Sequence, residues 1–535
     1  MRRLFATIIA SATLLGSATG FEEQIRPFLD RYCIDCHGGE KVKGKVDYSK
    51  IQTATDVDAQ FELWETVIDV LKHQEMPPEE EKLQPTESEA KAAQDWLRHR
   101  ISTPAEARPG EFKPRRLSGP EYRNTLRSLF GFDLEVSIVA AEQTVIEKSL
   151  VLKLLPTDPP GASGFINDTH GASLSTVIWD QYSFLADTAI EKLFTLRHRE
   201  KLEEFVGSSL PPKVQISQEQ ARQLIHRFTS RAFRRPVEEE QAIPSINGKT
   251  GSDLIEAVKT ELKTVLMSPA FMYRGLLMKG TPDKQQKVDD FEFAERLSYF
   301  LWEDMPDEEL SNAARNSKLS EKESITEQIE RMLASPKARS LSTSFAVQWL
   351  TLDEIDHISN DPTQVHAFKN QPIDFFNYLI SENRPVIELI DSKTAFANNL
   401  TAGFYGDDRK QIKKVAKPSG IERQALPNQR ITLHETNERG GILTMPGVLI
   451  MNKGPILRGT WMLRRILGEQ LSDPPADVPA IKPSPRGKNL SFRERFELHR
   501  SNATCARCHN KIDPLGFAMQ AYNDRGVYTH ITPHN

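Results

Sequence analysis

Apolar residues recur every three or four positions through most of the chain, and this spacing predicts a mainly α-helical protein. Three amphipathic helices are expected in the first hundred residues. The third begins at a capping box, in which the side chains of Thr86 and Glu89 satisfy free backbone N–H groups. The apolar faces are Phe21, Ile25, Phe28, Leu29 and Tyr32 on the first helix, Trp64, Val67, Ile68 and Leu71 on the second, and Ala93, Trp96, Leu97 and Ile101 on the third.

The middle of the chain, from about residue 115 to 405, continues the helical pattern. Asp289 and Asp290 precede a run of apolar residues at helical spacing, which predicts an N-cap and a buried helix. Pro306-Asp307 is typical of the first turn of the next helix. We interpret these segments as a helical scaffold.

Composition limits the class of protein. The chain has 535 residues, which is too long for one hydrophobic core, and three to five domains are expected. Charged residues make up 27% and hydrophobic residues 38%, as in folded globular proteins. The net charge is −5 without a long basic run, so nucleic-acid binding has no support.

All four cysteines belong to two C-x-x-C-H motifs, which is the pattern of covalent c-type haem attachment. Two thiols three positions apart reach the two vinyl groups on one edge of a porphyrin and form thioethers. The imidazole of the next residue then ligates the iron. The sequence therefore predicts two covalently attached haem c groups, held by Cys33, Cys36, Cys505 and Cys508, with His37 and His509 as iron ligands.

Other interpretations of the cysteines have less support. A thioredoxin-like redox pair would not need the following histidine and would lie in a βαβ context, which this sequence lacks. A zinc site would need the two pairs to meet across more than four hundred residues, whereas zinc pairs usually lie close in sequence. A structural disulfide at each motif is the remaining alternative.

The N-terminus is typical of a secretory signal peptide. Met1-Arg2-Arg3 is basic, Leu4 to Leu15 is largely apolar, and the small residues up to Gly20 suit cleavage near Gly20-Phe21. The apolar stretch is short for a membrane span, and no other run approaches that length, so no transmembrane segment is expected. Haem c is attached outside the cytoplasm, so we expect a periplasmic or otherwise extracytoplasmic protein.

The first haem needs a second axial ligand to carry electrons without reorganisation. Thioether sulfur is a common partner, and it raises the potential. Met76 lies 39 residues after His37, in a loop stiffened by Pro77 and Pro78, and is the predicted ligand. His73 is the competing candidate.

The distal ligand of the second haem is left open, and the site can also be five-coordinate. A turn at Asp513-Pro514 is expected to bring Leu515 and Phe517 back as apolar cover for this haem. The candidate ligands are Met445, Met451, Met462, Met519, His499, His530 and His534.

A basic cluster next to Pro236 has two interpretations. Its guanidinium groups match the geometry of haem propionates, so they are candidates to bind them. Internal ion pairs or a solvated helix end are the favoured interpretation. The residues are Arg231, Arg234 and Arg235.

With these motifs the chain resembles the planctomycete-type multidomain cytochrome c proteins. Their N-terminal cytochrome c domain is followed by serial domains of unknown function and a second C-x-x-C-H motif. The resemblance implies haem binding and electron transfer in the periplasm, without an established substrate. It rests on the Cys33 motif with Met76-Pro77-Pro78, on Arg116 to Leu126, Arg231 to Pro236, Ser268 to Arg274, Arg296 to Trp302, Arg439 to Leu443 and Cys505 to Phe517.

The expected organisation follows from these motifs. Members of this family continue beyond the second motif, whereas this chain stops 26 residues after His509, so the last domain is either short or truncated at its C-terminus. The expected segments are a signal peptide (1–20), a cytochrome c domain (21–104), three helical domains (112–178, 215–276 and 285–410) and a second haem-binding domain (430–535).

Two functions from different classes are expected. The favoured one is an extracytoplasmic dihaem electron-transfer protein that exchanges electrons with an unidentified redox partner protein. The alternative is a periplasmic haem oxidoreductase, peroxidase-like or dehydrogenase-like, with an open distal site at the second haem. The size of the middle region favours more than simple electron carriage, because a carrier needs only about a hundred residues per haem domain. The substrate, the oligomeric state and the catalytic residues are left open.

Overall fold

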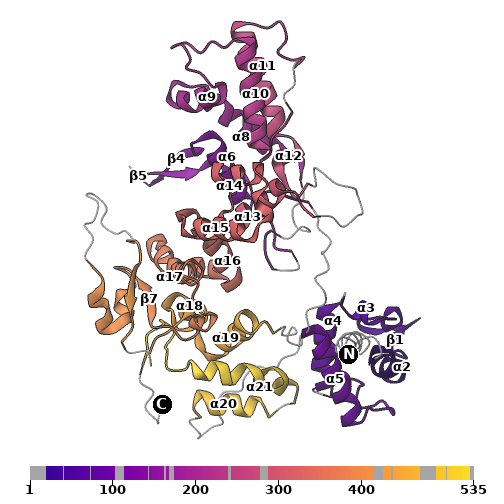
Figure 1. The fold of residues 1–535 in the computed structure, drawn as a ribbon. Helices are drawn as coiled ribbons and strands as arrows, with labels where there is room; N and C mark the ends of the chain where they lie inside the picture. The colour runs from indigo at the N-terminus through magenta and orange to yellow at the C-terminus, as the bar shows by residue number, and fades with distance from the viewer. Residues whose placement is uncertain are drawn as a thin grey trace, which may run out of the picture. The chain divides into compact units, whose positions relative to one another are not determined.

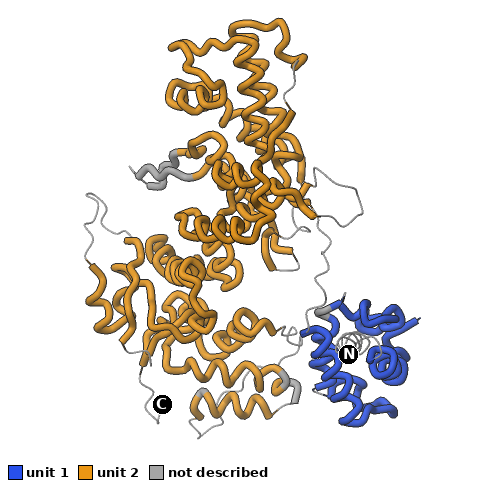
Figure 2. Tube along the Cα trace, viewed as in Figure 1, with its two compact units in different colours: residues 1–111 blue, residues 112–535 orange. Residues whose placement is uncertain are grey.

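The computed structural model divides the chain into two compact units, residues 1–111 and 112–535 (Figure 2). Each unit is described by itself. The residues that the structure describes are 20–39, 41–58, 60–72, 74–102, 114–141, 144–161, 164–167, 174–238, 243–276, 287–413, 426–434, 438–469, 490–501 and 503–529. The predicted signal peptide lies outside these ranges, apart from Gly20.

The first unit is a small helical domain built on the three predicted apolar faces. Its core is closed by Trp64, which is fully buried, and by Phe21, Ile25 and Leu29. The predicted capping box is confirmed, since the Thr86 backbone N–H donates to Glu89 at 2.8 Å. The elements are η1 (Phe21–Ile25), α2 (Arg26–Tyr32), β1 (His37–Gly38), β2 (Lys41–Val42), η2 (Lys43–Lys45), η3 (Tyr48–Lys50), α3 (Ala54–Asp58), α4 (Phe61–Lys72) and α5 (Glu87–Ser102).

The second unit begins with helices that share one core. Tyr122, Phe228, Phe271 and Tyr299 are buried together, although they are up to 177 residues apart in sequence. Figure 1 shows α8, α10 and α11 side by side. The elements are β3 (Arg115–Arg116), α6 (Gly119–Phe130), β4 (Glu135–Ala141), β5 (Thr144–Ser149), α7 (Leu150–Leu154), α8 (Thr176–Leu193), η4 (Leu196–His198), α9 (Arg199–Val206), α10 (Gln218–Ala232), α11 (Gly251–Leu266), α12 (Pro269–Met272) and β6 (Tyr273–Arg274).

The chain continues through a second set of helices to the C-terminal motif. Asp289 caps α13 as predicted, because its carboxylate accepts from the Glu292 backbone N–H at 2.8 Å. The elements are α13 (Asp290–Trp302), α14 (Glu308–Arg315), η5 (Lys318–Ser320), α15 (Lys322–Ala334), η6 (Pro336–Ala338), α16 (Arg339–Leu350), η7 (Leu352–His357), α17 (Pro362–Ser381), η8 (Val386–Leu389), β7 (Thr394–Ala397), η9 (Ala402–Gln411), β8 (Gln429–Thr432), η10 (Ile442–Thr444), α18 (Pro446–Met451), α19 (Gly454–Trp461), η11 (Met462–Ile466), α20 (Phe492–His499) and α21 (Ala503–Ala518).

The described strands form four antiparallel pairs, and the mainly α-helical prediction is confirmed. The hairpin of β4 and β5, with Glu135 opposite Ser149, was not predicted. Asp307 is the N-cap of α14 rather than part of its first turn. Within the described ranges, no helix has the length and apolar character that crossing a bilayer requires.

Helices α19 and α21 cross at very close range, and glycines make this approach possible. A Cβ atom on Gly459 would overlap the Ile512 carbonyl oxygen, and one on Gly516 would overlap the Pro455 carbonyl oxygen. Figure 1 shows the two helices packed side by side. The helix that carries the second cysteine motif, α21, is therefore fixed against α19.

Candidate functional site

The first cysteine motif forms a tight turn at the end of α2. The backbone N–H groups of Cys36 and His37 both donate to the Cys33 carbonyl, at 3.2 and 2.9 Å. Cys33 and Cys36 are free thiols, not a disulfide. Burial raises the pKa of the Cys33 thiol to about 12, as expected for a sulfur facing an apolar core. The turn therefore presents two thiols and an imidazole from five consecutive residues.

His37 is oriented by the backbone. Its Nδ1 atom lies 2.8 Å from the Lys43 carbonyl oxygen, and because a carbonyl only accepts, Nδ1 carries the proton. Nε2 is then the unprotonated nitrogen that is free to ligate a metal. The Tyr48 ring meets the imidazole edge-on at 5.7 Å between centroids, and the exposed Val42 is the cross-strand neighbour of His37.

Met76 lies outside this turn, in the loop between α4 and α5. Its side chain is 42% exposed, so its thioether is accessible but is not fixed in the core. The structure does not by itself join Met76 to His37, and Met76 as the second axial ligand stays a prediction. The competing His73 lies outside the described residues.

The second cysteine motif lies within one continuous helix, α21. Cys505 and Cys508 are three residues apart and His509 follows Cys505 by four, so all three share one helix face. Both cysteines are free thiols. The expected turn at Asp513-Pro514 is wrong. The helix runs through Pro514, whose missing N–H leaves the carbonyl of the exposed Asn510 to solvent.

His509 is oriented by a carboxylate instead of a carbonyl. Its Nδ1 atom lies 2.8 Å from Oδ1 of Asp513, one helical turn further on, and Asp513 is fully buried. Arg500 approaches the other carboxylate oxygen at 3.5 Å. Sequence analysis missed Asp513, because the proline after it was interpreted as a turn. The spacing of four residues on a helix was the signal that indicates this pair.

His499, at the end of α20, is the ligand candidate that contacts His509. The two imidazole rings meet edge-on with centroids 4.9 Å apart. Phe496 contacts both His509 and Phe517, with centroids 5.8 and 6.4 Å apart. His530 and His534 lie outside the described residues.

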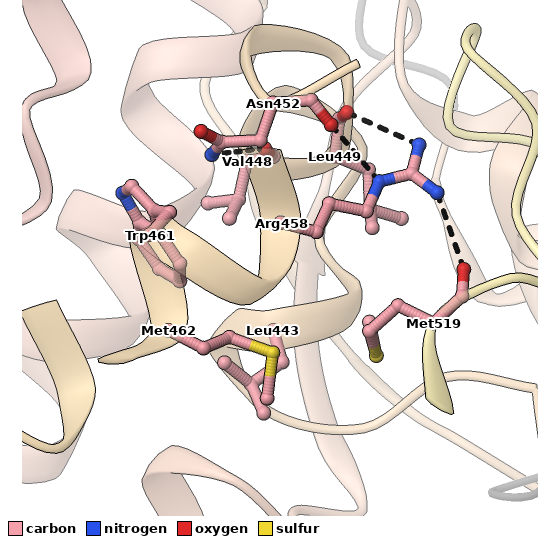
Figure 3. Close-up of a pocket in the computed structure, with 8 residues that line it drawn as sticks. All are labelled: Leu443, Val448, Leu449, Asn452, Arg458, Trp461, Met462 and Met519. Atoms are coloured by element: carbon pink, nitrogen blue, oxygen red, sulfur yellow. Dashed lines mark hydrogen bonds between the residues drawn. The ribbon is translucent and has the colours of Figure 1, made fainter. Parts of the chain in front are cut away.

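The methionine candidates for the second haem occupy the protein interior. Met462 and Met519 line a small, mostly apolar pocket with an empty volume of about 200 Å³ (Figure 3). Met519 follows His509 by ten residues, about 15 Å along a helix axis. Met445 belongs to a buried core cluster, and Met451 and Met462 both pack against it.

The pocket is held together by Arg458, a buried cation bonded to backbone carbonyls. Its guanidinium donates to the carbonyl oxygens of Asn452, Tyr522 and Asn523 at 3.0, 2.6 and 2.8 Å. It also donates to the carbonyl oxygens of Met519 and Leu449, at 3.2 and 3.4 Å, and both bonds are drawn in Figure 3. Arg458 therefore ties the segment after α21 to α18 and α19.

The basic cluster near Pro236 makes internal contacts. Arg234 is 5% exposed and donates to the Tyr299 hydroxyl at 3.0 Å and to the Phe271 carbonyl at 2.6 Å. Arg235 pairs with Asp289, and Arg231 donates to the Pro306 carbonyl. The favoured interpretation of internal contacts is confirmed. Binding of propionates by Arg234 is wrong, because its donors are already used inside the core.

A buried network around Glu121 was not predicted. Arg115 and Arg274 pair with its carboxylate at 2.6 and 2.9 Å. Burial raises the pKa of Glu121, but the two guanidinium groups outweigh this effect and lower it to about 2. Nearby, burial raises the pKa of Glu303 to about 7. The network joins segments that are far apart in sequence, and Nε of Arg274 stays buried in it without a hydrogen-bond partner among the described residues.

Comparison with known families identifies most of the second unit. Residues 115–195 match PSD3 (DUF1587), 220–275 match PSD5 (DUF1595), 288–406 match PSD4 (DUF1592) and 439–531 match PSCyt3 (DUF1588), each described as a protein of unknown function. These families are characteristic of planctomycete-type multidomain cytochrome proteins. No curated protein and no solved structure matches the chain.

The family matches cover part of the predicted organisation. They begin at residue 115, so they do not reach the first motif, and the N-terminal cytochrome c domain of planctomycete-type proteins stays a prediction here. The PSCyt3 match spans residues 439–531 and includes the second motif. The name of that family indicates a cytochrome.

The residues at both motifs fit a covalently bound haem c. Each offers two free thiols at the required spacing and an imidazole whose Nδ1 is already hydrogen-bonded. The ring nitrogen left over is Nε2, the atom that an axial ligand needs. The donor set therefore matches the chemistry that the spacing predicts.

Proposed function

We propose that this chain is an extracytoplasmic dihaem c-type cytochrome that transfers electrons to or from a partner protein. The observation that carries the proposal is the repeated arrangement of two free thiols beside a histidine whose Nδ1 is hydrogen-bonded. Haem c bound at each motif would supply one-electron redox chemistry. The basic and apolar N-terminal segment supports export, which haem attachment requires.

The chain's own residues would do the positioning. Cys33 and Cys36 would hold the first haem and His37 would ligate it, while Met76 is the proposed second ligand. The Lys43 carbonyl selects the tautomer of the neutral His37 ring in which Nδ1 carries the proton and Nε2 can ligate. A haem here would also cover Val42, which lies opposite His37 and is 43% exposed. Removal of apolar surface from water favours such an arrangement.

Mass spectrometry of the mature holo-protein tests the proposal directly. The expected result is a mass equal to the cleaved polypeptide plus two haem groups. Replacement of Cys33 and Cys36 by alanine should remove one haem, and the same change at Cys505 and Cys508 should remove the other. A chain with no added haem mass, or with each cysteine pair oxidised to a disulfide, contradicts the proposal.

A haem oxidoreductase is the second candidate function, and one observation favours it. Met462 and Met519, two of the candidate ligands at the second haem, line an interior pocket that His509 does not line. A ligand-free distal side would leave room for a substrate. Absorption and EPR spectra separate the two functions. Two low-spin six-coordinate haems support a carrier, whereas one high-spin haem that binds cyanide or peroxide supports an enzyme.

A further inference from the structure

We propose that Asp513 and Arg500 set the reduction potential of the second haem through His509, so that this haem has the lower potential of the two. The inference rests on the proposed haem at the second motif. It concerns positioning and charge, since neither side chain would touch the iron.

The partners of the two histidines differ in charge. His37 donates from Nδ1 to a backbone carbonyl, which is neutral. His509 donates from Nδ1 to a carboxylate oxygen at 2.8 Å. A carboxylate that accepts from the far nitrogen of a metal-bound imidazole increases the basicity of that ligand. A stronger donor stabilises the ferric state relative to the ferrous state and therefore lowers the potential.

The burial of Asp513 makes this effect large. The carboxylate is fully buried, and its Oδ2 atom accepts no hydrogen bond within the described structure. A buried charge is poorly screened, so the Asp513 carboxylate acts strongly on the imidazole beside it. Burying a charge with so few partners also costs stability, which is consistent with a role in the site. Asp513 lies one helical turn beyond His509, and the neighbouring Ile512 packs against α19, so the carboxylate is fixed beside the imidazole.

Arg500 acts in the opposite direction. Its Nε atom lies 3.5 Å from Oδ2 of Asp513, on the side away from His509. At this distance it offsets part of the carboxylate charge without replacing the hydrogen bond to the imidazole. The two side chains therefore have opposite effects: Asp513 lowers the potential of the second haem, and Arg500 limits the decrease.

The first haem has the reverse arrangement. A thioether ligand such as Met76 raises the potential, and a neutral carbonyl behind His37 adds no negative charge. The two effects together place the lower potential at the second motif. The order of the two potentials is thus a consequence of which acceptor lies behind each histidine.

Spectroelectrochemical titration of the holo-protein tests this assignment. Asp513→Asn keeps the shape and an acceptor oxygen but removes the charge. It should raise the potential of the second haem by about 59 mV, which corresponds to a tenfold change in the one-electron redox equilibrium constant. Arg500→Gln should shift the same potential downward. Asp35→Asn is the matched control, because it removes an exposed carboxylate from the first motif and should leave the second potential unchanged.

The outcomes are distinguishable. Opposite shifts for Asp513→Asn and Arg500→Gln support the inference, because a merely structural role would move both variants in one direction or neither. An unchanged potential in both variants, with two haems present by mass, overturns it. Should Asp513→Asn fail to fold, Arg500→Gln still provides the test, because the Arg500 side chain is partly exposed. Absence of haem at Cys505 and Cys508 in the unsubstituted protein overturns the proposed function instead.

Discussion

Gly459 in α19 and Ile512 in α21 are so close that any side chain on Gly459 would overlap the Ile512 carbonyl. Ile512 directly precedes Asp513, the buried acceptor of His509. Packing between two helices therefore determines the position of Asp513, the carboxylate that pairs with His509, the proposed iron ligand. The stability of this crossing and the properties of the site are physically linked.

Gly459→Ala should destabilise the second unit by about 1–3 kcal/mol, because overpacking forces the two backbones apart. The measurement is the midpoint of thermal unfolding of the full chain. Gly403→Ala is the matched control, since a Cβ atom there meets no neighbour within 4 Å. It should change stability by less than about 0.5 kcal/mol. Equal midpoints for the two variants would show that the crossing tolerates a methyl group.

Met76→Ala should abolish the sulfur-to-iron absorption band at the red end of the spectrum and lower the potential of the first haem. The reason is that the thioether is the proposed second axial ligand. Leu83→Ala removes another exposed apolar side chain of the same unit and should leave both properties unchanged. An unaltered spectrum and potential in Met76→Ala would remove Met76 as a ligand.

Glu303→Gln should stabilise the protein at pH 8 and leave it unchanged near pH 4. Burial raises the pKa of Glu303 from 4.5 to about 7, so the folded state binds this proton more tightly than the unfolded state does. Protonated Glu303 therefore makes its full contribution to the free energy of unfolding below about pH 4.5, and this contribution is lost as the pH rises to about 7. We expect a gain of about 2 kcal/mol at pH 8, allowing for partial exposure.

The Glu303 prediction is checked by denaturant unfolding at both pH values. Glu330→Gln, at an exposed position on α15, is the control and should show the pH dependence of the unsubstituted protein. If Glu303→Gln behaves like this control, Glu303 is ionised in the folded protein at neutral pH.

Arg234→Ala should reduce the stability of the second unit by about 3 kcal/mol or more, because it leaves buried acceptors on Tyr299, Ala270 and Phe271 without a donor. Haem content and absorption of the remaining folded protein should not change. Arg222→Ala, which removes an ion pair with Glu219 at the surface, should cost less than about 1 kcal/mol. A changed haem spectrum with unchanged stability would return Arg234 to the role of a propionate ligand.

The sequence predicted correctly the helix caps that depend only on residues close together in the chain. The Thr86–Glu89 box and the Asp289 cap depend on residues three positions apart, and both were confirmed. Pro514 was misread, because a proline inside a helix costs one hydrogen bond and some steric strain but does not always end the helix, and here the exposed Asn510 lies where solvent can bond its carbonyl. That error also hid the contact of Asp513 with His509.

Contacts between distant segments could not be predicted from local pattern. Arg234 finds its partners on α12 and α13, 36 to 65 residues away in sequence. The Glu121 network depends on Arg274, 153 residues away. Periodicity shows that a helix has a buried face, but it does not show which other helix packs against that face.

The hydrogen-bond acceptor of His37 Nδ1 is the main-chain carbonyl of Lys43, and this affects which substitutions the site tolerates. Every amino acid at position 43 supplies the same carbonyl oxygen, so natural variants should accumulate freely there without altering the first site. Position 513 has no such freedom, because only an acid provides an anion at that place. We expect a variable residue six places after the first histidine and an invariant aspartate four places after the second.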